Sequence, residues 1–334
     1  MALEIAPASR GIQKARARAG FLFALLAAAA AAPLSGCVSL PQTEGLRAAA
    51  PAGLPARTEL LDVAFHQQDD FLCGPAALAM AFDAAGVAAT IASLTPLVYL
   101  PGRQGSLQAE MLGATRRHGL VAYTPPPRLE SVLREVASGT PVVVLLNLGI
   151  RLVPLWHYAV LVGYDLEAGH VVLRSGDAPR KVVPIGFFEY LWQDSGYWAM
   201  LALAPGRVPP SAREPEFAAA VAALERAGRV RESRASYRAL LERWPQSLGG
   251  LVGLGNAEYA LGKRAAAERA FRRATLAHPD SAPAFNNLAH VLGELGRHAE
   301  AEAAARSAVA LGGPTLAQAQ KTLAEILARR ASRP

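Results

Sequence analysis

The residue best placed to do chemistry in this sequence is Cys73, which directly precedes Gly74 and Pro75. From Pro75 to Ala85 apolar residues recur at helical spacing. Proline is tolerated in the first turn of a helix, so the pattern predicts that Cys73 lies at a helix N-terminus. Unpaired amides and the helix dipole stabilise a thiolate there, so we expect a lowered pKa and a nucleophilic sulfur.

A thiol nucleophile needs an acid/base partner, and His157 stands at the start of an apolar segment that ends at Asp165. The β-branched and aromatic content of that segment predicts a strand. His157 could accept the thiol proton and later donate it to a leaving amine. A lone histidine before a strand is more often structural, and only the pairing with Cys73 favours catalysis. Gln67, six residues before the cysteine, could direct its amide at an oxyanion.

Taken together, Gln67, the Cys73-Gly74-Pro75 helix start and His157 before an apolar strand resemble the C39 family of cysteine peptidases. The resemblance covers roughly residues 60–204 and implies a papain-like α+β fold. It also implies Cys73 as nucleophile, Gln67 as oxyanion donor and His157 as general acid/base. Many members cleave leader peptides after a Gly-Gly pair, so the resemblance alone suggests such a substrate here.

The third catalytic member departs from the family pattern. In the family, the strand after the histidine ends in an aspartate that orients the imidazole, whereas here Ser175 takes that position and Asp177 follows two residues later. Asp177, our candidate, could reach His157 through a loop; alternatively, Ser175 or a backbone carbonyl orients the ring, or the triad is incomplete. Losing an orienting group slows a triad enzyme by orders of magnitude without abolishing its activity.

The elements expected to position these residues form an α+β domain over residues 59–205. Periodicity predicts helices over 107–118 and 128–137, and strands over 120–124 and 141–148. Segments 182–185 and 197–203 are expected to complete a sheet. His66, His118 and His170 have no companions at zinc-ligand spacing, so we expect no metal and no cofactor.

The second cysteine, Cys37, follows a basic stretch, an apolar run over residues 21–32 and the tripeptide Leu34-Ser35-Gly36. This is the order of a secretory signal, and the run is shorter than the roughly 20 residues that span a bilayer. A cysteine after Leu-Ser-Gly resembles the lipobox of bacterial lipoproteins, whose thiol is acylated. An ordinary secreted protein with a chance cysteine is the alternative.

We therefore predict a signal peptide over residues 1–36, a lipid on Cys37 and a flexible tether over residues 37–58. The lipidated protein would face the periplasm, and Val38 after the cysteine favours the outer membrane. Part of the formal net charge of +7 lies in the first 36 residues, and the remainder is spread out. We therefore expect no nucleic-acid partner.

A 34-residue repeat occupies residues 214–330, marked by Gly228, Gly262 and Gly296. The middle copy resembles a tetratricopeptide repeat at Leu254, Gly255, Tyr259, Ala267, Phe271, Ala274 and Pro279. Three repeats and a capping helix are expected, with a concave face that binds a peptide or protein partner. Asn286, Asn287 and Arg273 are candidate groove residues, although solvated surface is an equal alternative for each.

The sequence thus predicts a lipid-anchored cysteine peptidase whose repeats recruit or position a protein substrate. The alternative is a lipoprotein with a degenerate peptidase fold that acts as a binding or assembly scaffold. Thioester chemistry at Cys73 would also serve transpeptidation, and nothing in the sequence separates that reaction from hydrolysis.

Overall fold

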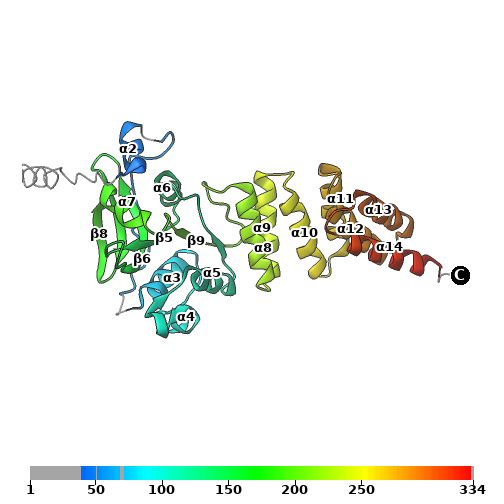
Figure 1. The fold of residues 1–334 in the computed structure, drawn as a ribbon, viewed down its shortest axis with the longest axis horizontal. Helices are drawn as coiled ribbons and strands as arrows, with labels where there is room; N and C mark the ends of the chain where they lie inside the picture. The colour runs from blue at the N-terminus through cyan, green and yellow to red at the C-terminus, as the bar shows by residue number, and fades with distance from the viewer. Residues whose placement is uncertain (1–38, 50, 68–70, 332–334) are drawn as a thin grey trace, which may run out of the picture. The chain divides into compact units, whose positions relative to one another are not determined.

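The computed structural model describes residues 39–49, 51–67 and 71–331 (Figure 1). The predicted signal peptide and Cys37 lie outside the described residues. From Leu40 onward the chain forms one compact unit. In the described residues, no helix is both long enough and apolar enough to cross a bilayer.

The first half of this unit is built on a seven-stranded antiparallel sheet with the order β4-β9-β5-β6-β7-β8 in the described residues, and β1 also pairs with β6. The strands are β1 (Arg57–Glu59), β4 (Val121–Tyr123), β5 (Val142–Asn147), β6 (Trp156–Asp165), β7 (His170–Ser175), β8 (Ala178–Pro184) and β9 (Ala199–Leu203). Every strand predicted from the sequence is confirmed.

The sheet is a middle layer with apolar side chains packed on both faces. Because side chains alternate along a strand, Val142 and Val144 of β5 join one core cluster, whereas Val143 and Leu145 join the other. This two-sided burial explains why β5 reads as a continuous apolar run rather than an alternating pattern. The sequence pattern of a buried strand therefore has a direct structural cause.

Five helices pack around the sheet (Figure 1). They are α3 (Cys73–Ala84), α4 (Ile91–Val98), α5 (Gln108–Arg117), α6 (Leu129–Ala137) and α7 (Ile185–Gln193). The short strands β2 (Tyr99–Leu100) and β3 (Gly105–Ser106) form a hairpin around the 3-10 turn η1 (Pro101–Arg103). The predicted helices over 107–118 and 128–137 are confirmed as α5 and α6, whereas the sequence pattern did not predict α7.

A further helix, α2 (Pro41–Ala48), lies where the sequence predicts a flexible tether. Its first turn is held by Glu189, a fully buried residue of α7, whose carboxylate accepts hydrogen bonds from the backbone N–H of Gln42 (3.0 Å) and of Thr43 (2.6 Å). The Gln42 side chain in turn accepts from the N–H of Leu129 at the start of α6 (2.6 Å). The expected tether over 37–58 is therefore interrupted by a docked helix, because a buried carboxyl group accepts hydrogen bonds from the amides of its first turn.

The second half is all helical and follows the predicted repeat. Its helices are α8 (Glu214–Arg226), α9 (Val230–Arg243), α10 (Leu248–Ala260), α11 (Arg264–Ala277), α12 (Ala282–Glu294), α13 (His298–Leu311) and α14 (Leu316–Ala331). Gly228, Gly262 and Gly296 end the first helix of each pair with φ of 81°, 73° and 76°, a conformation that favours glycine. Three helix pairs and a terminal helix are thus confirmed.

The repeats begin in direct contact with the sheet domain. Glu135 of α6 accepts a hydrogen bond from the N–H of Ser211 (2.8 Å), and the Tyr123 hydroxyl accepts one from the N–H of Arg213 (3.2 Å). The rings of Tyr123 and Phe217 pack edge to face with centroids 5.6 Å apart. The segment that connects the two halves is therefore bound to the surface of the sheet domain.

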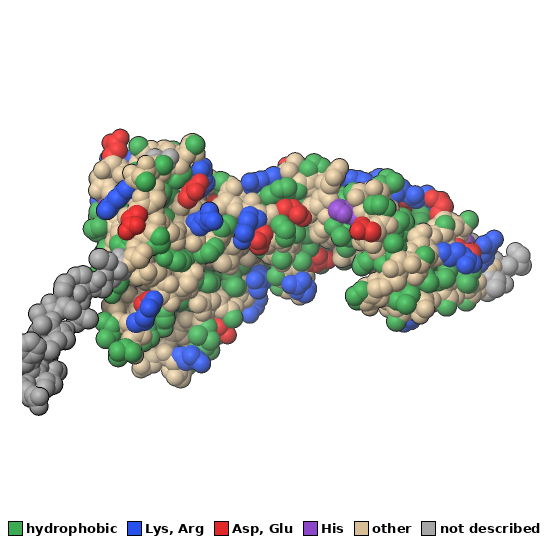
Figure 2. Space-filling model, turned by 45° about the horizontal axis from the view of Figure 1, so that its top comes forward, with side chains coloured by type: hydrophobic (Ala, Val, Ile, Leu, Met, Phe, Trp, Pro, Cys, Tyr) green, Lys and Arg blue, Asp and Glu red, His purple; other side chains and the backbone are tan. Residues whose placement is uncertain are grey.

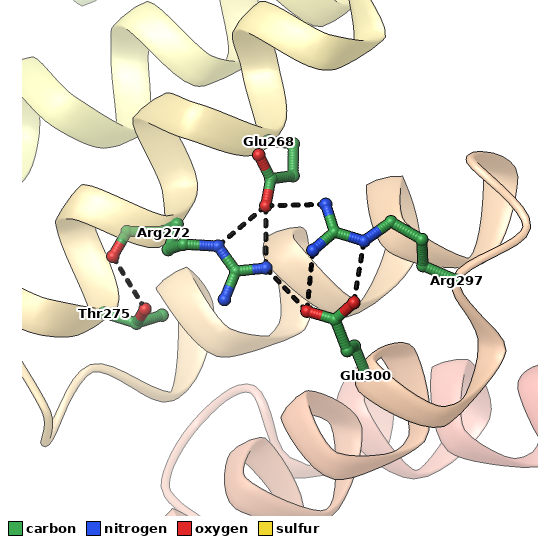
Figure 3. A network of polar contacts seen from close by, with 5 residues as sticks. All are labelled: Glu268, Arg272, Thr275, Arg297 and Glu300. Carbon is green, nitrogen blue, oxygen red and sulfur yellow. Dashed lines mark hydrogen bonds and ion pairs between the residues drawn. The ribbon is translucent and has the colours of Figure 1, made fainter.

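Ion pairs join consecutive repeats (Figure 3). One Glu268 carboxylate oxygen accepts from Arg272 on the same helix (2.7 Å) and from Arg297, just before α13 (3.1 Å). Glu300 accepts from the same two arginines, at 3.0 Å from Arg272 and 2.7 Å from Arg297. The side chain of Glu268 is only 10% exposed, whereas that of Glu300 is 48% exposed. The two carboxylates therefore offer a matched comparison.

We expect Glu268→Ala to lower the free energy of unfolding by about 1–3 kcal/mol, because it leaves two arginines without a largely buried partner. Glu300→Ala should have a much smaller effect, since exposed ion pairs contribute little. Urea denaturation followed by circular dichroism measures both. Equal losses for the two variants would contradict the assigned role of Glu268.

Candidate active site

Cys73 is the first residue of α3, at the helix N-terminus that the sequence predicts. It lines a cavity of about 550 Å³. The cavity walls come from the start of α3, residues 103–107, the connection between β5 and β6, and Gly176. His157, the second residue of β6, lines the same cavity. The fold therefore brings together two residues that are 84 positions apart in the chain.

A second cavity of about 540 Å³ lies between α2 and the start of α6. Its described lining contains neither cysteine nor histidine. Size alone therefore does not separate the two cavities, and the paired nucleophile and base single out the one at Cys73.

The imidazole of His157 is held by Ser175, the last residue of β7. The His157 Nε2 and Ser175 Oγ atoms are 2.9 Å apart, and Ser175 is buried. Asp177 lies exposed in the turn between β7 and β8. Of the alternatives that the sequence leaves open, the geometry favours Ser175 as the orienting group. When Nε2–H donates to Ser175, Nδ1 carries the lone pair that a general base needs.

His157 is neutral at physiological pH. Burial, aided by the positive charge of Lys181, lowers the pKa of its imidazole to about 4. A hydroxyl partner cannot offset this effect, because it brings no negative charge to stabilise an imidazolium. The site therefore holds its histidine as a base rather than as an acid.

The pKa of Cys73 is raised, which corrects the lowered value expected from the helix N-terminus. Burial is the largest cause, and it outweighs hydrogen bonds from the backbone at Tyr158, Gly74 and Cys73 itself, which favour the thiolate. The resting site is thus a neutral thiol beside a neutral imidazole. If the thiol attacked a carbonyl carbon, its proton would have to leave during the attack rather than before it.

Gly74 makes room for a side chain beneath the nucleophile. A Cβ at this position would collide with the Ser106 side chain, so glycine permits β3 to pack against the start of α3. The Ser106 hydroxyl is buried without a hydrogen-bond partner in the described structure, and the Ser106 carbonyl accepts from the Tyr158 hydroxyl (3.3 Å). The sequence did not predict a role for Ser106 or Tyr158. Ser106 lies beside Gly74 only after folding, whereas Tyr158 directly follows His157 in the chain.

Gln67 is exposed and is not among the described residues that line the cavity. Its role as oxyanion donor stays a prediction. Gln104 does line the cavity and has a φ of 47°, while Phe71, also in the lining, has a φ of 66°. Left-handed backbone at non-glycine residues costs free energy and gathers at functional sites. Among the described residues, no group of histidine, cysteine, aspartate and glutamate is arranged to hold a metal ion.

Comparison with known proteins supports both halves of this description. Residues 60–200 match the Peptidase_C39 like family, and residues 282–311 match the tetratricopeptide repeat. The chain therefore contains a C39-like, peptidase-related domain followed by tetratricopeptide repeats. No curated protein matches the chain.

Solved structures resemble the two halves separately. A Bacillus anthracis protein named as C39-like peptidase is 20% identical, with 43% of this chain and 96% of that chain covered and a TM-score of 0.37. The first tetratricopeptide domain of Spaghetti (RPAP3), bound to an HSP90 peptide, is 18% identical, with 36% and 94% covered and a TM-score of 0.34. The secretion chaperone SycD of Yersinia enterocolitica is 17% identical, with 35% and 85% covered and a TM-score of 0.33.

The raised pKa of Cys73 predicts that alkylation of this thiol by iodoacetamide rises about tenfold per pH unit between roughly pH 7 and 9, as the thiolate fraction grows. Ser175→Asp should raise the pKa of His157, because a carboxylate stabilises the imidazolium, and so increase the rate at pH 7 by about tenfold. Mass spectrometry of the modified chain measures the rates.

Asp177→Ala is the control and should leave the pH profile of Cys73 alkylation unchanged, since Asp177 is exposed in its turn. A wild-type rate that is already constant between about pH 6 and 8 would instead indicate a preformed thiolate and imidazolium pair. A lower rate in Asp177→Ala would show that this carboxylate reaches His157.

Proposed function

Since residues 60–200 match the Peptidase_C39 like family and place a cysteine and a histidine in one cavity, we propose that this protein is a cysteine peptidase. Cys73 is the nucleophile and His157 the general acid/base. The observation that carries the proposal is the cavity that Cys73 and His157 both line.

The reaction proceeds through a thioester. His157 Nδ1 takes the thiol proton while Cys73 Sγ attacks the substrate carbonyl carbon, and the tetrahedral oxyanion then collapses with cleavage of the C–N bond. The imidazolium gives its proton to the leaving amine. A water molecule next attacks the thioester and passes a proton to His157, which returns it to the departing Cys73 sulfur.

Ser175 positions the ring throughout this cycle. Its hydroxyl fixes the orientation of Nε2 but adds no charge, so the transient imidazolium is stabilised less than it would be by a carboxylate. The N-terminus of α3 presents the backbone N–H groups of Cys73 and Gly74, which would donate to the oxyanion once substrate is bound. We expect a slow enzyme of the same chemical class.

The repeats are proposed to recruit the polypeptide substrate or a protein partner. A groove of about 260 Å³ is lined by Asn256, Tyr259, Asn286, Asn287 and other residues of α10, α11, α12 and α14. The Asn286 Oδ1 atom is buried and has no hydrogen-bond partner among the described residues, so it can accept a peptide N–H. Arg273, also suggested by the sequence, donates to the Pro245 carbonyl instead of lining this groove.

The proposed location is the cell envelope, with the protein anchored through a lipid on Cys37 and facing the periplasm. The order of the N-terminal residues supports this proposal. Positive and negative side chains are interspersed on the face drawn in Figure 2, which fits protein partners better than nucleic acid.

A second candidate function is a binding or assembly scaffold with a degenerate catalytic domain. The specific observations in its favour are the neutral state of His157 and the hydroxyl of Ser175 in place of a carboxylate. This candidate keeps the repeats as the functional part.

Peptide hydrolysis by residues 39–334 separates the two functions. We expect Cys73→Ala to abolish cleavage of a mixed peptide library and His157→Ala to slow it by about 10²-fold or more, because it removes the acid/base group. His170→Ala, a histidine at the start of β7 that does not line the cavity, is the matched control. Cleavage that survives Cys73→Ala would overturn the peptidase proposal, and no cleavage by the wild type would favour the scaffold.

Membrane fractionation of Cys37→Ser in a bacterial host tests the anchor. The wild type should sediment with membranes, whereas the variant should be released into the soluble envelope fraction, because it lacks the thiol that carries the lipid. Mass spectrometry of each fraction establishes whether the signal peptide has been removed. A fully processed variant that still sediments with membranes would contradict the lipid anchor.

A further inference from the structure

The connection between β5 and β6 exposes an unusual run of large apolar side chains. Exposed apolar residues in and beside this hairpin are Leu148, Ile150, Leu152, Val153, Leu155 and Trp156. Leu155 is 62% exposed, although burying such a side chain stabilises a protein by about 1.5–3 kcal/mol. Contiguous exposed apolar surface marks a binding site, and the part of this surface that lines the catalytic cavity is formed by Leu148, Leu155 and Trp156.

The hairpin is held in one conformation by its own polar contacts. The Asn147 Oδ1 atom accepts from the N–H of Gly149 (3.0 Å) and of Leu155 (2.9 Å), and its amide donates to Asp194 (3.0 Å). Arg151 donates to the other oxygen of the same carboxylate (3.0 Å). These bonds preorganise the apolar surface, so a ligand need not order it on binding.

One side of the hairpin is a wall of the catalytic cavity. Leu148, Leu155 and Trp156 line it, and Phe71 adds another apolar ring. Leu155 and Trp156 directly precede His157 in the chain and line the same cavity as this acid/base group. Among the described lining residues, Arg103 is the only one that is charged at neutral pH. The surface next to the reacting atoms is therefore mainly apolar.

A Gly-Gly pair has no side chain to bury against such a wall. A cavity of about 550 Å³ instead has room for bulky groups, and it falls in the size range of ordinary ligand pockets, about 300–1,000 Å³. Burial of apolar surface on both partners would supply binding free energy. The substrate itself is the expected occupant, because the apolar wall is continuous with the catalytic pair.

We infer that the substrate carries a bulky apolar side chain next to the scissile bond, in place of the Gly-Gly pair that the family resemblance suggests. Leu155 and Trp156 determine this specificity. The inference rests on the proposed peptidase function, since it assigns the substrate class of the same site.

The experiment compares the rates at which residues 39–334 are modified at Cys73 by two peptidyl acyloxymethyl ketones, one ending in Leu-Leu and one in Gly-Gly. Wild-type protein should react at least about tenfold faster with the Leu-Leu probe, a preference that corresponds to about 1.4 kcal/mol. Leu155→Ala should reduce the ratio of the two rates about fivefold or more. Parallel alkylation by iodoacetamide corrects for any change in the thiol itself.

Leu152→Ala is the matched control, because Leu152 belongs to the same hairpin and is 91% exposed, yet does not line the cavity. It should leave the ratio unchanged. Equal rates for the two probes, or an equal loss of preference in Leu152→Ala, would overturn the inference. The former would remove the apolar preference, and the latter would indicate that the hairpin acts through a contact outside the cavity.

Failure of the proposed function has a different signature. In that case each peptidyl probe modifies Cys73 of the wild type no faster than Cys73 of the His157→Ala variant. A Gly-Gly preference that depends on His157 would instead retain the peptidase and reject only the apolar specificity.

Discussion

The pairing of β6 with its neighbours is the constraint on which the site depends. β6 pairs with β5 over residues 156–161, with β7 over residues 160–165 and with β1 over residues 163–165. His157 is the second residue of this strand and lines the same cavity as Cys73. Ser175 reaches the imidazole only because β7 runs antiparallel beside this strand and ends there. A shift in register would separate all three groups.

Burial decides the charge state of the catalytic pair. The decrease in the pKa of His157 from 6.5 to about 4 corresponds to roughly 3 kcal/mol against the imidazolium. The backbone hydrogen bonds at the start of α3 are too weak to keep the Cys73 pKa down once the sulfur loses solvent. In the proposed reaction, contacts with the substrate would have to offset this desolvation, so the apolar cavity wall would affect the rate as well as binding.

We propose that the two halves of the molecule bind polypeptide by different physical means. The groove of the repeats contains side-chain amides, and the buried Asn286 Oδ1 atom there can accept a hydrogen bond from a peptide N–H. The catalytic cavity offers apolar surface on a hairpin fixed by Asn147 and Asp194. Polar contacts in the groove suit the backbone of an extended peptide, whereas the apolar cavity wall suits a bulky side chain. In this proposal the repeats hold the polypeptide and the cavity sets the side-chain specificity.

By itself, the sequence determined the features that depend on local pattern. The helix after Cys73, the strand after His157 and the 34-residue repeat follow from short-range periodicity, proline and glycine positions, so each could be predicted. Only the tertiary structure decided that Ser175 holds His157, that burial raises the pKa of Cys73, and that Glu189 docks a helix inside the expected tether. Those outcomes depend on desolvation and on contacts between distant segments, neither of which is visible in residue spacing.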